Sequence, residues 1–222
     1  MKRKNRSLKY NSRSSAQAGM TLVELMVVLA IFAIVTGITI FDYGRFKSSV
    51  SLQNLGDDIA LSIRRAQNYA IGVRSSSSVF TIGYGIHFST ANPDPSNVRA
   101  GSNKAFIIFN DLPVANKTYD YSQTSDAVCG SIALSSRDEC MDILKITSND
   151  VVSAICPNGS NCSSGYADIT FLRPNPDAYI CVGSIGGPCG DKISSVDIVI
   201  ENSQSHDKKT ISVSNVGQIS IK

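Results

Sequence analysis

The first 19 residues contain no acidic side chain, although six basic ones are present. Of the 21 lysines and arginines in the chain, 15 therefore lie beyond residue 19, against 18 aspartates and glutamates. The chain beyond residue 19 is slightly acidic, which is not typical of a general polyanion binder. Basic charge confined to one end is typical of a targeting segment. The six basic residues are Lys2, Arg3, Lys4, Arg6, Lys9 and Arg13.

Histidine is scarce and tryptophan is absent, and no catalytic nucleophile motif is present. We expect His87 to be an exposed histidine on a strand, with its side chain on the face opposite to those of Ile86 and Phe88. We expect His206 to face solvent in the polar turn 203–209. The sequence therefore predicts a protein that is not an enzyme and that needs no cofactor.

The chain has no CxxC pair, and its six cysteines all lie between residues 129 and 189. An even number of cysteines, all far beyond the apolar run of residues 20–41, predicts disulfides in an oxidising compartment. Six cysteines allow 15 connectivities. Short loops favour three local bridges over a metal site. These are Cys129–Cys140, Cys156–Cys162 and Cys181–Cys189.

Calcium binding is also disfavoured, because no run of oxygen ligands has the spacing of a calcium loop. The acidic residues in or beside predicted turns are expected to be solvated. These are Asp94, Asp168, Asp177 and Asp191.

Residues 20–41 form an apolar run with a single charged side chain, Glu24. As a helix, these 22 residues would span about 33 Å, enough to cross the hydrocarbon core of a bilayer. A secretory signal peptide has a shorter apolar stretch and is cleaved after it, whereas here the small-residue sequence ending at Gly19 precedes the apolar run. An uncleaved signal anchor would explain the span but not Glu24.

Glu24 is costly within a membrane unless its charge is paired. Cleavage after Gly19 would create a free amine at Met20, at a similar depth in the membrane. The helix dipole favours a carboxylate near its N-terminus, and Glu24 of one subunit could neutralise the Met20 amine of a neighbour. This pairing would give both attraction and axial register between subunits.

The run Ala-Gly-Met-Thr-Leu-Val-Glu-Leu at residues 18–25 resembles the cleavage and methylation motif of type IV prepilins and type II secretion pseudopilins. The resemblance implies that a prepilin peptidase cuts after Gly19 and methylates Met20, and that Glu24 acts in filament assembly. Met20 departs from the family's usual phenylalanine, which puts efficient methylation in doubt. The implied partners are the peptidase, other pilin or pseudopilin subunits, an inner-membrane assembly platform and membrane lipid.

Beyond residue 41 the pattern predicts an α+β fold, in which the second half of one long helix packs on an antiparallel β-sheet head. The expected parts are a cleaved leader (1–19), a transmembrane and filament-core helix (20–41), an amphipathic second half (42–73) and a β-rich head (74–222). The predicted apolar stripe of the second half comprises Leu52, Leu55, Ile59, Ile63, Ala66 and Ala70. Predicted strands are 79–82, 84–88, 105–109, 143–146, 151–155, 169–171, 179–182, 196–200, 210–213 and 219–221, with a hairpin joining the last two across 214–217.

Residues 60–70, 84–88 and 105–111 resemble the H-type secretion pseudopilins and FimT-type minor pilins, whereas the cysteine-bearing region finds no counterpart. The resemblance implies a minor pilin or pseudopilin that assembles or primes a type IV pilus or type II secretion pseudopilus. It also implies a single-pass inner-membrane protein with its C-terminal head outside the cytoplasm.

An adhesive or DNA-binding module is the alternative, because FimT-like proteins in some bacteria bind DNA. Contact with nucleic acid would require scattered basic residues to converge on one face, and the acidic body disfavours it. The candidate contacts are Arg99, Lys104, Lys117, Arg173, Lys208 and Lys209.

Overall fold

The computed structural model describes residues 19–72, 83–92, 100–111, 116–120, 129, 139–172, 175–183 and 193–222. The side chains of residues 41 and 42 are not among those described. The predicted leader up to residue 18 and the predicted strand 79–82 lie outside these residues. The chain divides into two compact units, Met1–Gly44 and Arg45–Lys222, and the second unit is called the head below.

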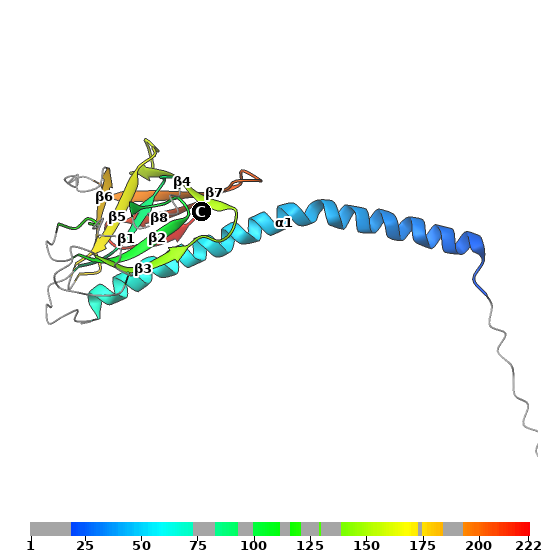
Figure 1. Cartoon of the computed structure of the whole chain (residues 1–222), viewed down its shortest axis with the longest axis horizontal. Coiled ribbons are helices and arrows are strands. Elements are labelled where there is room, and N and C mark those ends of the chain that lie inside the picture. The colour runs from blue at the N-terminus through cyan, green and yellow to red at the C-terminus, as the bar shows by residue number, and fades with distance from the viewer. Residues whose placement is uncertain are drawn as a thin grey trace, which may run out of the picture. The chain divides into compact units, whose positions relative to one another are not determined.

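One helix, α1 (Leu22–Ile71), contributes to both units (Figure 1). It ends at Ile71, within two residues of the predicted bound, and the N–H of Gly72 donates to the carbonyl of Asn68 at 2.8 Å. The predicted stripe from Leu52 to Ala70 is buried at every position. Spacings of three and four residues place these side chains on one side of the helix, so that side faces the head core.

The strands of the head form two antiparallel sheets. In sheet one the order is β3-β2-β1-β5-β6, and in sheet two it is β4-β7-β8-β9. Every strand predicted within the described residues is present, including the β8–β9 hairpin. The bounds are β1 (Gly83–Ser89), β2 (Ala105–Asp111), β3 (Cys140–Lys145), β4 (Asp150–Pro157), β5 (Tyr166–Phe171), β6 (Ala178–Gly183), β7 (Ser195–Asn202), β8 (Lys208–Ser214) and β9 (Ile219–Ile221).

The second half of α1 and both sheets share one apolar core. Alternate residues of β1 and β7 point into it, as the period of two requires. Examples are Ile86 on β1 and Ile198 on β7, both fully buried. The long helix packed on antiparallel sheet confirms the predicted α+β fold.

A second layer covers the face of sheet one that points away from α1. It contains Ile107, Phe109, Tyr119 and Cys140, which form a smaller apolar cluster. Gly85 permits this packing, because a Cβ at that position would lie 2.4 Å from Cζ of Phe109. Strand β1 is therefore buried on both faces along its whole length.

Candidate functional site

The start of α1 is fixed by Thr21, which caps the helix in two ways. Its carbonyl oxygen accepts the first helical hydrogen bond, from the Leu25 N–H at 3.1 Å, and its Oγ1 accepts the Glu24 N–H at 3.3 Å. Both contacts define an N-cap residue. Gly19 and Met20 consequently precede the helix, and both are exposed. The peptide bond between them lies outside helical structure.

Glu24 lies in the first turn of α1, three residues after its cap. A Thr-x-x-Glu sequence is the spacing of a capping box, and the helix dipole stabilises a carboxylate in this turn. Its side chain makes no ion pair with the described part of the chain. Glu24 is also exposed, close to the predicted cleavage point, where a group from another molecule could reach its carboxylate.

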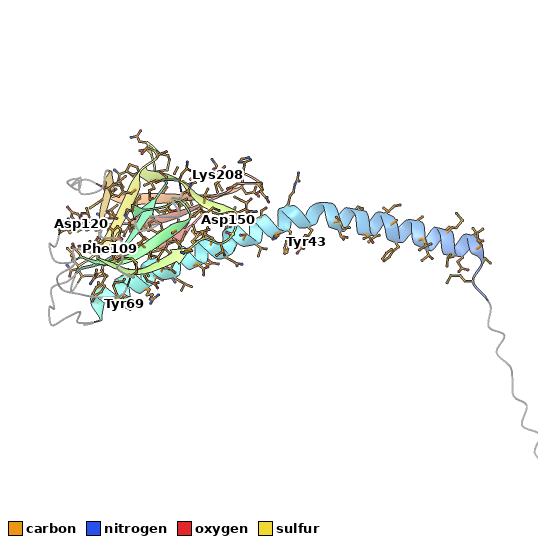
Figure 2. All side chains as sticks on the ribbon, viewed as in Figure 1. Tyr43, Tyr69, Phe109, Asp120, Asp150 and Lys208 are labelled. Carbon is orange, nitrogen blue, oxygen red and sulfur yellow. A yellow bond between two sulfur atoms is a disulfide. The ribbon has the colours of Figure 1, made fainter. Side chains whose placement is uncertain are left out.

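The first half of α1 presents apolar side chains on all sides. Leu22, Phe32 and Ile40 are 74%, 67% and 68% exposed, and Figure 2 draws such side chains projecting from this part of the ribbon. An 18-residue window has a mean hydropathy of 2.5, and none of it is buried within the chain. By length and composition, this helix could cross a membrane.

One polar side chain in this segment, that of Thr39, is satisfied locally. The Thr39 hydroxyl contacts two carbonyl oxygens of its own helix, those of Val35 at 3.2 Å and Thr36 at 2.9 Å. Local bonding of this kind removes much of the cost of placing threonine in lipid. Glu24 is then the charged group of the segment that still needs a partner from outside.

In the head, His87 is buried, and the prediction of an exposed histidine is wrong. Its Nδ1 lies 2.6 Å from Oδ1 of Asp168, and both side chains are at most 2% exposed. The rings of Tyr119 and Tyr166 lie 5.0 and 5.6 Å from the imidazole. Alternation correctly separated His87 from Ile86 and Phe88, but it could not reveal that a second layer covers the other face.

Asp168 lies within β5 rather than in a solvated turn, so that prediction is also wrong. Asp177 is exposed immediately before β6, as expected. His206 is exposed in its turn, with Nδ1 3.0 Å from Oε1 of Glu201. Hydrogen bonding to His206 lowers the pKa of Glu201, with a further contribution from Lys208. Asp94 and Asp191 lie outside the described residues.

Each described basic candidate for DNA contact makes a contact with another residue of this chain. Lys104 Nζ donates to the carbonyls of Ser148 and Asp150, and Lys117 lies 4.0 Å from the ring centroid of Tyr179. Lys208 pairs with Glu201, and Lys209 donates to Gln53. These contacts leave the described lysines less available to phosphates. Arg99 and Arg173 lie outside the described residues.

The Cys129–Cys140 and Cys156–Cys162 pairs are disulfide-bonded. They are two of the three pairings that short loops favour. Cys181 is also disulfide-bonded, while Cys189 lies outside the described residues. Within the described ranges, no group of three histidine, cysteine, aspartate or glutamate side chains could hold a metal ion.

Comparison with known proteins gives one family match, to the prokaryotic N-terminal methylation motif, over residues 14–40. The matched segment contains Gly19, Met20 and Glu24. This motif supports the class of type IV pilins and pseudopilins, whose members are structural subunits processed by a prepilin peptidase. No curated protein and no solved structure matches the chain.

Proposed function

We propose that the protein is a minor pilin or pseudopilin, a membrane-anchored subunit that assembles or primes a type IV pilus or a type II secretion pseudopilus. One observation carries the proposal. An exposed Gly19–Met20 peptide precedes a capped apolar helix with Glu24 in its first turn, within the segment that matches the methylation motif.

Processing would begin with cleavage after Gly19. Thr21 supports this step, because its two capping contacts leave the peptide bond outside the helix, where a protease can bind an extended chain. The mature protein would start at Met20, and residues 20–41 would serve as its anchor. The chain would then cross the inner membrane once, with its head outside the cytoplasm and its disulfides in an oxidising compartment.

Assembly would rest on Glu24. The carboxylate is exposed and has no ion-pair partner among the described residues, and an unpaired charge in lipid costs several kcal/mol. Pairing with the Met20 amine of a neighbouring subunit removes the cost for both groups. The apolar surface of α1 would pack against other subunits and the assembly platform.

Within the class, we favour the H-type pseudopilins and FimT-type minor pilins, because of the sequence similarity in residues 60–70, 84–88 and 105–111. The disulfide-bearing head also favours a minor subunit over a bulk one. An adhesive or DNA-binding role remains the second candidate. The internal contacts of Lys104, Lys117 and Lys208 weigh against nucleic acid.

Replacement of Glu24 by Gln tests the assembly role. We expect the Glu24→Gln variant to be cleaved normally but to appear in the sheared filament fraction at a level reduced at least about ten-fold, because the neighbour's amine loses its partner. Asp57→Asn removes the same charge from an exposed position outside the apolar span and serves as the control. Normal incorporation of Glu24→Gln would contradict the pairing.

A further inference from the structure

A cavity of about 590 Å³ opens at one end of sheet one. It lies where three residues are paired directly across neighbouring strands: Ser89 of β1 opposite Tyr166 of β5, and Tyr166 opposite Gly183 of β6. The volume falls in the range typical of small-ligand sites. Gly183 contributes no side chain, which leaves space beside the Tyr166 hydroxyl.

A disulfide-closed loop holds one wall of the cavity in place. Ile155 and Ser163 line this wall. The N–H of Ile155 donates to the carbonyl of Ser163 at 3.2 Å, and the N–H of Ser163 donates to the carbonyl of Ile155 at 3.0 Å. The Cys156–Cys162 disulfide closes the loop between them. The wall therefore exists before any ligand arrives, which lowers the entropy lost on binding.

The floor of the cavity is also rigid. Tyr166 stacks on His87, whose ring is held by Asp168 at 2.6 Å. Gly101, at φ +98°, brings its backbone close above this floor. A Cβ there would lie 2.8 Å from Cβ of Ser89 and 2.9 Å from Nε2 of His87. The buried His87–Asp168 pair thus fixes the aromatic side chain of the cavity.

No residue with a charged side chain is among the described residues that line the cavity. Burial, with the nearby charge of Asp168, raises the pKa of Tyr166 to about 12, so its hydroxyl stays neutral at physiological pH. Charged ligands such as phosphates or ammonium groups would find no counter-charge here. The chemistry of the lining therefore favours an uncharged ligand.

Hydroxyl groups provide the polar part of the lining. Ser163 and Ser164 are exposed, and neither side chain bonds to another described residue. Ser89 Oγ accepts the Ala91 N–H at 3.1 Å and keeps its own proton to donate. Val182 supplies apolar surface beside these groups. Neutral hydroxyls can bond to the hydroxyl groups of a sugar. The aromatic ring and the aliphatic surface suit its apolar C–H face.

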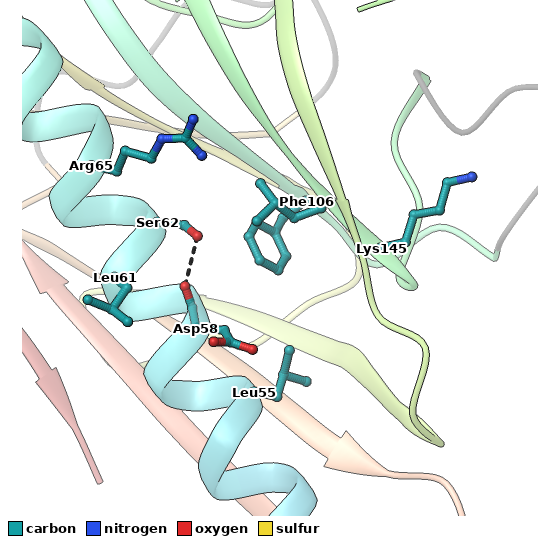
Figure 3. Close-up of a pocket in the computed structure, with 8 residues that line it drawn as sticks. Leu55, Asp58, Leu61, Ser62, Arg65, Phe106 and Lys145 are labelled. Atoms are coloured by element: carbon teal, nitrogen blue, oxygen red, sulfur yellow. Dashed lines mark hydrogen bonds between the residues drawn. The ribbon is translucent and has the colours of Figure 1, made fainter.

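A second cavity, of about 360 Å³, lies between α1 and strands β2 and β3 and offers a contrast (Figure 3). Two of its four polar side chains, Ser62 and Arg65, already bond within the protein. Ser62 Oγ donates to the Asp58 carbonyl at 2.8 Å, and Arg65 bonds to Asp142 and Tyr69. The charged side chains of Asp58 and Lys145 also line this cavity, so its chemistry differs from that of the uncharged cavity beside Tyr166.

We propose that the cavity at Ser89, Tyr166 and Gly183 binds one uncharged sugar residue of a surface glycan. The hydroxyls of Ser163, Ser164 and Ser89 would bond to hydroxyls of the sugar. This inference rests on the geometry of the head and holds whether or not Gly19 is the cleavage point.

The test uses the full chain in a detergent without a sugar headgroup, since a glycosidic detergent would compete. Saturation-transfer NMR with a panel of uncharged methyl glycosides measures binding. We expect at least one glycoside to bind, and the double variant Ser163→Ala, Ser164→Ala to weaken it about 25-fold, because each neutral hydrogen bond contributes about five-fold. The matched control is Ser203→Ala, which changes an exposed serine in the β7–β8 turn. This variant should bind the glycoside as the unchanged protein does.

Two results would overturn the proposal. One is the absence of saturation transfer from every glycoside in the panel, with near-UV circular dichroism showing a folded head. The other is binding that the double variant leaves unchanged. Failure of glycan binding with normal cleavage after Gly19 would reject the sugar site alone, and the reverse result would reject only the pilin assignment.

Discussion

The two halves of α1 are both rich in apolar residues, yet only the second half buries them within this chain. In the first half, side chains such as Phe32 are mostly exposed and apolar on every side. In the second half, Ile59 and Ile63 are fully buried in the head core, while Asp57 and Arg64 face outward. In the proposed function, one helix would thus obtain its stability in two ways: from this chain's own packing, and from lipid or other subunits.

The largest expected effect separates the two halves directly. Ile63→Ala should lower the free energy of unfolding of the head by about 4 kcal/mol, because it removes buried surface and leaves a cavity. Ile34→Ala makes the same chemical change at a 64% exposed position and should change it by less than about 0.5 kcal/mol. Denaturant unfolding of the full chain in micelles, followed by near-UV circular dichroism of buried Tyr84 and Tyr119, measures both.

Equal destabilisation by the two variants would contradict the comparison. It would mean that the first half of α1 is packed within the head fold, although its described side chains are exposed.

Asp150 (labelled in Figure 2) is a polar attachment point between the second half of α1 and the strands of the head. Its fully buried carboxylate accepts hydrogen bonds from Ser51 of α1 at 2.5 Å, Ser148 at 2.6 Å and Asn202 of β7 at 2.6 Å. Asp150→Ala leaves three donors without their acceptor and should cost about 3 kcal/mol in the same unfolding assay.

Asp57→Ala is the control, since this exposed carboxylate bonds only weakly, to Gln53 at 3.3 Å. A cost below about 0.5 kcal/mol for Asp150→Ala would show that apolar contacts alone hold the second half of α1 to the strands of the head.

The layer opposite α1 should make the stability of the head depend on pH. Burial raises the pKa of Asp111 to about 6, although backbone N–H groups of Lys117 and Asn116 partly oppose the shift. A raised carboxyl pKa means that the folded state holds its proton more tightly. The contribution of Asp111 to the stability of the head should therefore be greatest below about pH 4 and be lost as the pH rises through about 6, a loss on the order of 2 kcal/mol.

Measurement of the unfolding free energy from pH 4 to pH 7.5 checks this. Asp111→Asn keeps one acceptor oxygen and removes the titration, so its profile should be flatter by that amount over the same range. An Asp111→Asn profile with the same slope as the wild-type profile would contradict the account.

The sequence was sufficient for features that depend on local pattern. Spacing along the chain located the buried stripe of α1 from Leu52 to Ala70, and alternation with turn residues located the strands. The apolar run and Glu24 located the segment that matches the methylation motif. Each of these signals comes from residues close together in the chain.

Features that depend on distant residues were missed. His87 and Asp168 meet across β1 and β5, and their burial depends on a layer that strand alternation does not report. The carboxylate of Asp150 accepts a hydrogen bond from Ser51, which lies 99 residues earlier in the chain. The Thr21 cap, by contrast, could have been predicted, because Thr21 and Glu24 have the spacing of a capping box.

Mass spectrometry of the mature N-terminus tests the central claim most directly. The protein purified from membranes of a host with a prepilin peptidase should begin at Met20, with the amine of that residue methylated to some extent. A chain that begins at Met1, or one that is cut after Phe41, would contradict the account, because no free amine would then lie four residues before Glu24.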